Sequence, residues 1–190
     1  MAGDIVVVGT SRGGLKACQV LLSGLEANFP VPIVIVQHRG KDESSLCDYL
    51  NRTSPLPVSE PEDKEAILAG HVYLAPRDYH LLIEGTNFAL SIDPPVGYAR
   101  PSIDVLFESA VDQYKDRTIG VILTGVNRDG ASGLAAIKSQ GGLTVVEDPR
   151  SAAHSEMPEA AVARVHPDWI LPLGEIAARL NSLCGSLAVH

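Results

Sequence analysis

The sequence predicts an α/β protein with a doubly wound, mostly parallel sheet, helices on both faces of that sheet, and a β-hairpin insertion. Two observations lead to this prediction. Short, wholly apolar runs rich in β-branched residues alternate along the chain with segments of helical periodicity. These runs also lack the alternation of polar and apolar residues that a half-exposed strand shows, and strands buried on both faces are typical of parallel sheets.

The amino-terminal part of the chain begins with one such strand, at residues 5–8. Apolar residues then recur at helical spacing and predict a helix over about residues 15–25. Residues 33–36 form a second apolar run, and a helix is expected at about residues 43–52. The sequence Thr-Ser-Pro-Leu-Pro at residues 53–57 ends that helix, because proline cannot continue it.

Residues 55–95 differ in character and predict a β-rich insertion within the domain. Residues 71–75 are expected to form a strand. Residues 81–84 and 88–92 are apolar or alternating segments on either side of Gly-Thr-Asn at 85–87, a pattern typical of a β-hairpin.

The clearest helix covers residues 103–114, where apolar side chains follow one helical face. Ser102 can cap this helix, and Asp104 suits the positive end of its dipole. The strand–helix alternation then resumes. The remaining strands are expected at residues 118–123, 143–146 and 169–171, and the remaining helices at about 131–140, 157–163 and 174–183.

Length and composition limit the possible functions. At 190 residues the chain can bury a substantial core, and we expect residues 1–190 to form a single domain. A formal net charge of −8 and the lack of a long apolar run argue against nucleic-acid binding and membrane insertion. The first strand starts by residue 5, which leaves no room for a signal peptide, so we expect a cytoplasmic protein.

The cysteines do not suggest a metal or disulfide framework. Cys18, Cys47 and Cys184 are an odd number without Cys-x-x-Cys spacing, so we expect small buried hydrophobic residues in a reducing compartment. The histidines, cysteines and carboxylates also lack metal-ligand spacing. The sequence therefore predicts neither a metal nor a cofactor.

Residues 9–13, Gly-Thr-Ser-Arg-Gly, lie between the first strand and the first helix and fit the pattern Gly-x-Ser-x-Gly. A sharp turn from strand to helix presents the middle serine, Ser11, as a nucleophile and frees the Arg12 amide to stabilise an oxyanion. Two other interpretations remain open. The glycine-rich loop can hold a phosphate at the helix N-terminus, or Ser11 can simply cap the helix.

Ser11, His38 and the loop that holds Asn127 and Asp129 each follow the carboxyl end of a predicted strand, and ligands of such sheets bind at that edge. A serine nucleophile needs a base, and a histidine base needs an acceptor that fixes its tautomer. Ser11, His38 and Asp129 could supply all three parts. Alternatively, His38 is a polar residue at a strand end, and Asp129 caps the helix that follows it. His154 is the reserve candidate for the base.

These segments resemble the protein-glutamate methylesterases of bacterial chemotaxis. Gly-Thr-Ser-Arg-Gly-Gly at residues 9–14 looks like that family's nucleophile loop, and Gln37-His38 looks like its base segment. The resemblance implies a doubly wound catalytic domain with a Ser11–His38–Asp129 triad. It also implies hydrolysis of γ-glutamyl methyl esters, and often glutamine deamidation, on the cytoplasmic helices of chemoreceptors or similar acidic helical proteins. Further matches follow in the family's order at residues 70–76, 100–107, 120–125, 129–131 and 157–158.

The sequence departs from the family near the expected site. Arg12 replaces the usual threonine, Val126 replaces the usual methionine, and residues 39–43 replace a proline-rich segment. The candidates for oxyanion or substrate binding are Arg12, Gly13 and Val126. The Arg12 amide is expected to be one oxyanion donor; the second is unassigned, with the Gly125–Val126 backbone as a candidate.

The chain contains no counterpart of the family's phosphorylatable receiver domain, so we expect any regulatory partner to act in trans. The alternative to an enzyme is a non-enzymatic signalling module that binds a partner helix or an anionic ligand at the same edge of the sheet.

Overall fold

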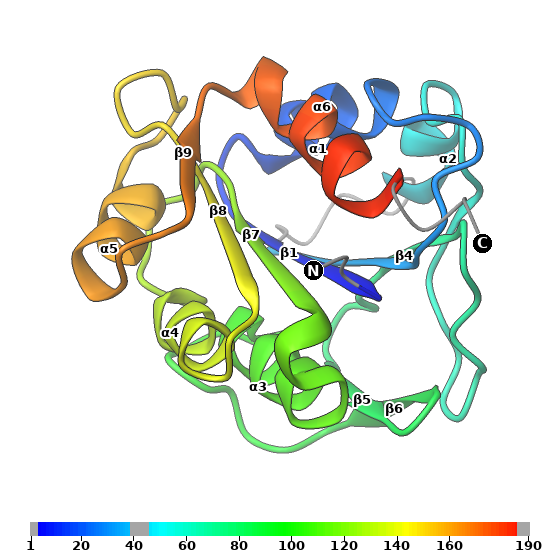
Figure 1. Cartoon of the computed structure of the whole chain (residues 1–190). Helices are drawn as coiled ribbons and strands as arrows, with labels where there is room; N and C mark the ends of the chain where they lie inside the picture. Colours follow the sequence, from blue (N-terminus) through cyan, green and yellow to red (C-terminus); the bar gives the residue numbers. More distant parts are fainter. Residues whose placement is uncertain (1–3, 39–45, 186–190) are drawn as a thin grey trace.

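The computed structural model describes residues 4–38 and 46–185. Within these residues, seven strands form one sheet in the order β3-β4-β2-β1-β7-β8-β9, and each neighbouring pair is parallel. Strands β5 and β6 form a separate antiparallel hairpin. The predicted fold class, including the hairpin, is therefore confirmed (Figure 1).

Strands and helices alternate along most of the chain. The expected helix at about residues 43–52 is described as α2, and residues 43–45 lie outside the described part of the chain. The elements are β1 (Ile5–Thr10), α1 (Gly14–Ser23), β2 (Ile33–Gln37), α2 (Leu46–Asn51), β3 (Val58–Ser59), β4 (Val72–Leu74), β5 (His80–Glu84), β6 (Asn87–Ser91), α3 (Ile103–Tyr114), η1 (the 3-10 turn Lys115–Arg117), β7 (Thr118–Ile122), α4 (Ala131–Ser139), β8 (Leu143–Glu147), α5 (Glu156–Arg164), β9 (Trp169–Leu171) and α6 (Leu173–Cys184).

The central strands are buried on both faces, which explains why they lack polar alternation. In β1, Val6 and Val8 pack into the core beneath α1 and α6, whereas Ile5 and Val7 pack into the core beneath α3, α4 and α5. Figure 1 shows α1, α2 and α6 on one side of the sheet and α3 and α4 on the other. Helices thus cover both faces.

The extent of the β-rich insertion was wrongly predicted. Strands β3 and β4 lie in the segment 55–95 but extend the main sheet, because β4 pairs in parallel with β2 and β3 with β4. The separate β structure is the β5–β6 hairpin, which packs against α3 through Leu81, Ile83 and Phe88. Strand β3 has two residues, which is too short for a sequence pattern to mark.

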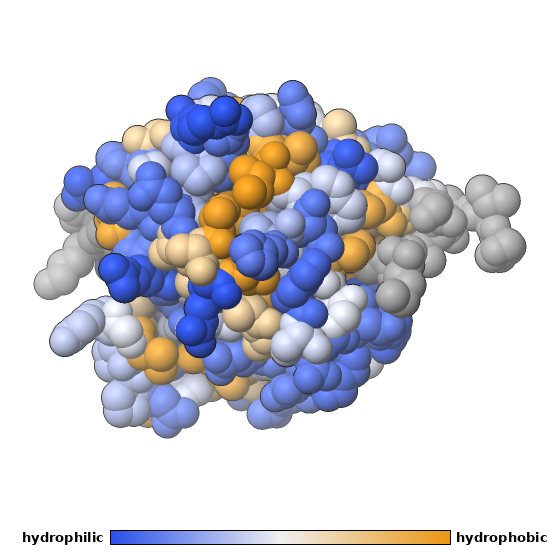
Figure 2. All heavy atoms as spheres, turned by 60° about the vertical axis from the view of Figure 1, so that its left-hand side comes forward, coloured by the Kyte–Doolittle hydropathy of each residue, from blue (hydrophilic) through white to orange (hydrophobic). Residues whose placement is uncertain are grey.

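The opposite edge of the sheet is formed by β9, where Ile170 is 43% exposed. The side of the molecule that carries α5 and β9 shows a band of hydrophobic side chains among hydrophilic ones (Figure 2). None of the helices in the described ranges, 4–38 and 46–185, is long and apolar enough to cross a membrane.

Candidate active site

The three predicted site residues follow strands that are neighbours in the sheet, β2, β1 and β7. The register pairs Thr10 with Gln37 and Gly9 with Ile122, so the chain leaves these strands at the same edge. Ser11 and His38 line the same cavity, which has a volume of about 850 Å³. Asp129 lies beside it, in hydrogen-bond contact with His38.

Ser11 lies on the sharp turn between β1 and α1. Its backbone amide donates to the Thr124 carbonyl at 3.0 Å, and the neighbouring Thr10 hydroxyl donates to the same carbonyl at 2.7 Å. The residue that caps α1 is Gly13, with φ +82°, and no side chain caps this helix. The interpretation of Ser11 as a helix cap is therefore wrong. Glycine suits position 13, because any other residue would be strained at this φ. Its Cβ would also lie 3.2 Å from the Thr124 side chain.

The residues predicted to bind an oxyanion or substrate lie beside this turn. Arg12, Gly13 and Val126 line a second hollow of about 580 Å³ together with Ser11 and His38. Among the described residues, none accepts a hydrogen bond from the backbone amides of Arg12 and Val126. Within this part of the chain, both N–H groups thus remain available as donors near the serine. Residues 39–43, the other departure from the family, lie outside the described part of the chain.

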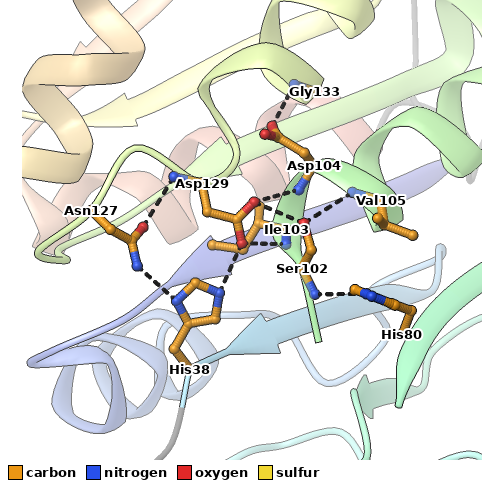
Figure 3. A network of polar contacts seen from close by, with 9 residues as sticks. All are labelled: His38, His80, Ser102, Ile103, Asp104, Val105, Asn127, Asp129 and Gly133. Atoms are coloured by element: carbon orange, nitrogen blue, oxygen red, sulfur yellow. Dashed lines mark hydrogen bonds and ion pairs between the residues drawn. The ribbon is translucent and has the colours of Figure 1, made fainter. Parts of the chain in front are cut away.

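Asp129 receives hydrogen bonds from the His38 ring and from the N-terminus of α3 (Figure 3). His38 Nε2 lies 2.8 Å from Asp129 Oδ2, and the Ile103 amide donates to the same oxygen at 2.7 Å. The other oxygen, Oδ1, accepts from the Ser102 hydroxyl at 2.9 Å and from the Asp104 amide at 3.0 Å. All four partners donate, which suits an ionised carboxylate.

Burial by itself would raise the pKa of Asp129, but the hydrogen bonds from His38 and from the Asp104 and Ile103 amides outweigh it and hold this pKa below its ordinary value. The helix that Asp129 caps is α3. The helix that follows it, α4, begins at Ala131; its N-cap residue is Gly130, and no side chain caps it. The alternative explanation of Asp129, as the cap of the next helix, is therefore wrong.

A second carboxylate, that of Asp104, also connects α3 and α4, but it lies on α3 and binds the N-terminus of α4. Asp104, in the first turn of α3, accepts a hydrogen bond at 2.7 Å from the Gly133 amide in the first turn of α4. The N-terminus of α3 is thus held by a residue preceding α4, and that of α4 by a residue of α3. Burial raises the pKa of Asp104, and the α4 amides partly offset this.

Two further residues of this network, Ser102 and His80, were not predicted as parts of the site, whereas Asn127 was predicted to lie at this edge with its loop. Ser102 caps α3, as expected, but its hydroxyl also donates to Asp129. His80 is buried, and its Nδ1 accepts a hydrogen bond at 3.2 Å from the Ser102 amide. Asn127 Nδ2 lies 3.0 Å from His38 Nδ1. The sequence pattern holds no signal for the contacts of Ser102 and His80, because they depend on how β5 and α3 pack beside β7.

The reserve base is not placed at the cavity. The His154 backbone binds the loop after β7, where its carbonyl accepts from the Gly125 amide at 3.1 Å. Its side chain is not among the residues that line either hollow beside Ser11. Within the described ranges, no group of three or more His, Cys, Asp or Glu residues is arranged to hold a metal ion.

Comparison with known proteins identifies the family. The family model described as CheB methylesterase matches residues 6–180. The chain belongs to the CheB methylesterase family. The crystal structure of the Thermotoga maritima CheB methylesterase catalytic domain superposes with a TM-score of 0.91 at 37% identity, covering 96% of this chain and all of that domain. The predicted resemblance is thereby confirmed.

Two relatives show how much of a longer protein the chain represents. A Leptospira interrogans protein, provisionally named protein-glutamate methylesterase/protein-glutamine glutaminase, is 46% identical over 92% of this chain and 91% of its own length. The T. maritima protein-glutamate methylesterase/protein-glutamine glutaminase is 37% identical over 96% of this chain, but over 55% of its own length. The chain thus spans about half the length of that longer relative.

The loop after β7 also depends on a buried acid, which gives a prediction. Glu147 is 2% exposed and accepts a hydrogen bond at 2.7 Å from the Thr124 amide. Burial raises its pKa, and this hydrogen bond partly offsets the rise. Because the folded state favours the protonated acid, its stabilising contribution is full below the ordinary pKa and is lost as pH rises through the folded value.

We expect Glu147→Gln to match the wild type in thermal stability near pH 4 and to melt a few degrees higher near pH 8, since glutamine keeps the acceptor without burying a charge. Thermal unfolding followed across this pH range measures the difference. Glu159→Gln, at an exposed position of α5, is the matched control and should show no pH-dependent gain. A Glu147→Gln protein that is less stable at pH 8 would contradict the account.

Proposed function

We propose that this protein hydrolyses the methyl esters of glutamate side chains in a protein substrate, with Ser11 as nucleophile, His38 as base and Asp129 as the acceptor that orients His38. The observation that carries the proposal is the His38–Asp129 pair, at 2.8 Å, beside a serine on a strand-to-helix turn. The printed names of the relatives, protein-glutamate methylesterase/protein-glutamine glutaminase, support the same reaction and add glutamine deamidation.

The proposed reaction proceeds through an acyl-enzyme. Ser11 Oγ attacks the ester carbonyl carbon while its proton passes to His38, and the resulting oxyanion accepts hydrogen bonds from the Arg12 and Val126 amides. The C–O bond to the methoxy group then breaks, and His38 returns the proton to release methanol. Water, activated by the same histidine, hydrolyses the acyl-enzyme and restores Ser11. With glutamine as substrate, ammonia leaves in place of methanol.

In this proposal the Asp129 carboxylate stabilises the His38 imidazolium that forms during the reaction. Because the pKa of Asp129 is lowered, this carboxyl group is ionised at neutral pH. It can therefore balance the positive charge on His38 without taking the proton. No metal or cofactor has a step in this reaction. We also place the reaction in the cytoplasm, where the methylated helices of chemoreceptors lie.

The proposed partner is the methylated region of a chemoreceptor or a similar acidic helical protein. The cavity that holds Ser11 and His38 has one wall made by residues 97–101. Val96 and Ala99 exchange two backbone hydrogen bonds, at 2.9 and 3.0 Å, around a tight turn. Tyr98, at this turn, has φ +68° and is fully exposed. An exposed aromatic side chain that lines the cavity suits contact with a helix that carries the ester. A regulatory partner could bind the same face in trans.

The first test is whether Ser11 is a nucleophile. We expect a serine-directed organophosphonate to label Ser11, and the protein to release methanol from methylated receptor fragments. Ser11→Ala should abolish the labelling and lower the rate by several powers of ten. Ser132→Ala removes an exposed serine from α4, near the same loop, and is the matched control. A folded wild-type protein without labelling or turnover would favour the non-enzymatic signalling module.

The second test separates the two contacts of Asp129. In Asp129→Asn, either orientation of the amide turns an NH2 group toward two donors, so we expect a loss of about 1–3 kcal/mol in the free energy of unfolding. Turnover per folded molecule should fall much further, by about 10⁴-fold, because His38 loses its charged acceptor.

Asp104→Asn is the control for that test, since its oxygen can still accept from Gly133 while Asp129 is unchanged. Turnover per folded molecule should then stay near the wild-type value. Thermal unfolding and methanol release are measured on each variant. Near-normal turnover in Asp129→Asn would remove Asp129 from the proposed triad.

The third test concerns the partner. We expect Tyr98→Ser to raise KM for a methylated receptor fragment roughly tenfold, the loss of one well-packed aromatic contact, and to leave hydrolysis of a small ester unchanged. Tyr98→Phe should restore KM, because it keeps the ring. Ile170→Ser, at the exposed position of β9 on the far edge of the sheet, is the control. An unchanged KM in Tyr98→Ser would exclude this turn from substrate binding.

A further inference from the structure

Asn127 makes two hydrogen bonds that fix the orientation of its side-chain amide. Its Oδ1 accepts from the Asp129 backbone amide at 3.0 Å, within the loop between β7 and α4. Since a backbone amide can only donate, this contact identifies the oxygen end of the side chain. The NH2 end is therefore directed to His38 Nδ1, 3.0 Å away, as a donor (Figure 3).

The tautomer of His38 follows from its two partners. Its Nε2 faces Asp129 Oδ2 at 2.8 Å, and an ionised carboxylate can only accept, so Nε2 carries the hydrogen. Its Nδ1 faces the Asn127 NH2 group, so Nδ1 is unprotonated and accepts. Turning the ring over would place carbon atoms against both partners. Nδ1 is thus the ring nitrogen that can receive a proton.

The nitrogen that must serve as base is therefore already hydrogen-bonded. Within the described residues, no hydrogen bond joins Ser11 Oγ to the His38 ring, although both residues line the same two hollows. A lone pair that accepts from Asn127 is not free to accept the serine proton. The structure thus holds the nucleophile and the base next to each other but unconnected.

We propose that Asn127 is a positioning residue that holds His38 in a resting state, and that Ser11 gains its base only when the Asn127 amide leaves Nδ1. This inference rests on the proposed function of Ser11 and His38. Protonation of Nδ1 also breaks the contact, because the amide NH2 cannot accept a hydrogen bond. Asn127 therefore favours the neutral ring over the imidazolium.

The position of Asn127 suits release by the substrate. Its side chain lines the cavity that holds Ser11 and His38, and it also borders a groove of about 880 Å³ between α4 and α5. Its neighbours Val126 and Arg128 are exposed. Asp129, by contrast, is 9% exposed and held by the N-terminus of α3. A ligand entering the cavity therefore meets the Asn127 side of the imidazole before the buried Asp129 side.

Two variants separate a restraint on His38 from a role in loop structure. Asn127→Ala removes the donor and the loop acceptor together. Asn127→Asp keeps an oxygen for the Asp129 amide but places a carboxylate against Nδ1, which favours the imidazolium. A merely structural role predicts that folded Asn127→Ala keeps the wild-type titration of the His38 ring, because only the loop contact then matters. A restraint on His38 predicts that Asn127→Asp differs from the wild type more than Asn127→Ala does.

The measurements are the pH–rate profile for ester hydrolysis and the NMR titration of the His38 ring. For Asn127→Ala we expect the rate on the high-pH plateau to rise roughly two- to tenfold, the worth of one hydrogen bond, and both midpoints to move to higher pH. For Asn127→Asp the midpoints should move further in the same direction. Among the described residues, the other ionisable or charged side chains that contact His38 or line the same hollows stay constant across the series: Asp129, Arg77, Asp78, Tyr98, Arg100, Arg12, Lys16 and Tyr49.

The proposal is overturned if folded Asn127→Ala and Asn127→Asp proteins both keep the wild-type midpoints. It is also overturned if Asn127→Ala lowers the plateau rate while the midpoints stay fixed, since Asn127 would then assist catalysis. The NMR titration needs no turnover. If the wild type hydrolyses no ester, the proposed function fails, whereas the midpoints of the three proteins still test the contact between Asn127 and His38.

Discussion

The carboxylate of Asp129 is the interaction on which both the fold and the candidate site depend. It accepts from two backbone amides at the N-terminus of α3, from the Ser102 hydroxyl and from His38. Hydrogen bonds to charged groups contribute about 1.5–3 kcal/mol each. The pair Asp104–Gly133 completes the connection by holding α4 to α3. His38 is thus connected to α3 and α4, two of the helices that cover one face of the sheet.

This arrangement links the stability of the fold to the chemistry of the site. The pKa of Asp129 is held below its ordinary value, so its stabilising contribution is present above that value and is lost as pH falls through the folded pKa. The same protonation removes the charge that orients His38. The buried ring of His80 also helps to hold Ser102 in place, because its Nδ1 accepts a hydrogen bond from the Ser102 amide. Acid therefore weakens the α3 cap and the proposed triad together.

Periodicity and the alternation of strands and helices predicted most of the fold and the candidate site residues. Ser11, His38 and Asp129 were predicted to cluster because the carboxyl ends of parallel strands lie at one edge of the sheet. In the structure the three residues follow neighbouring strands at that edge. Contacts between distant segments were not predictable. The bond from Ser102 to Asp129 spans 27 positions of the chain and depends on how α3 packs against β7. Strand β3 was missed because two residues carry no pattern.

The two ring nitrogens of His38 are held by supports of different rigidity. Nε2 is bound to a carboxylate that is fixed by α3, and moving that carboxylate would break the cap of a 12-residue helix. Nδ1 is bound to Asn127, which lies on a loop between two exposed residues. Release of the Asn127 amide from Nδ1 costs one neutral hydrogen bond, about 0.5–1.5 kcal/mol. A change of state at the site is therefore least costly at Nδ1. The orientation of the His38 ring thus depends on the core of the fold. Whether its Nδ1 is free to accept a proton depends on the exposed loop that carries Asn127.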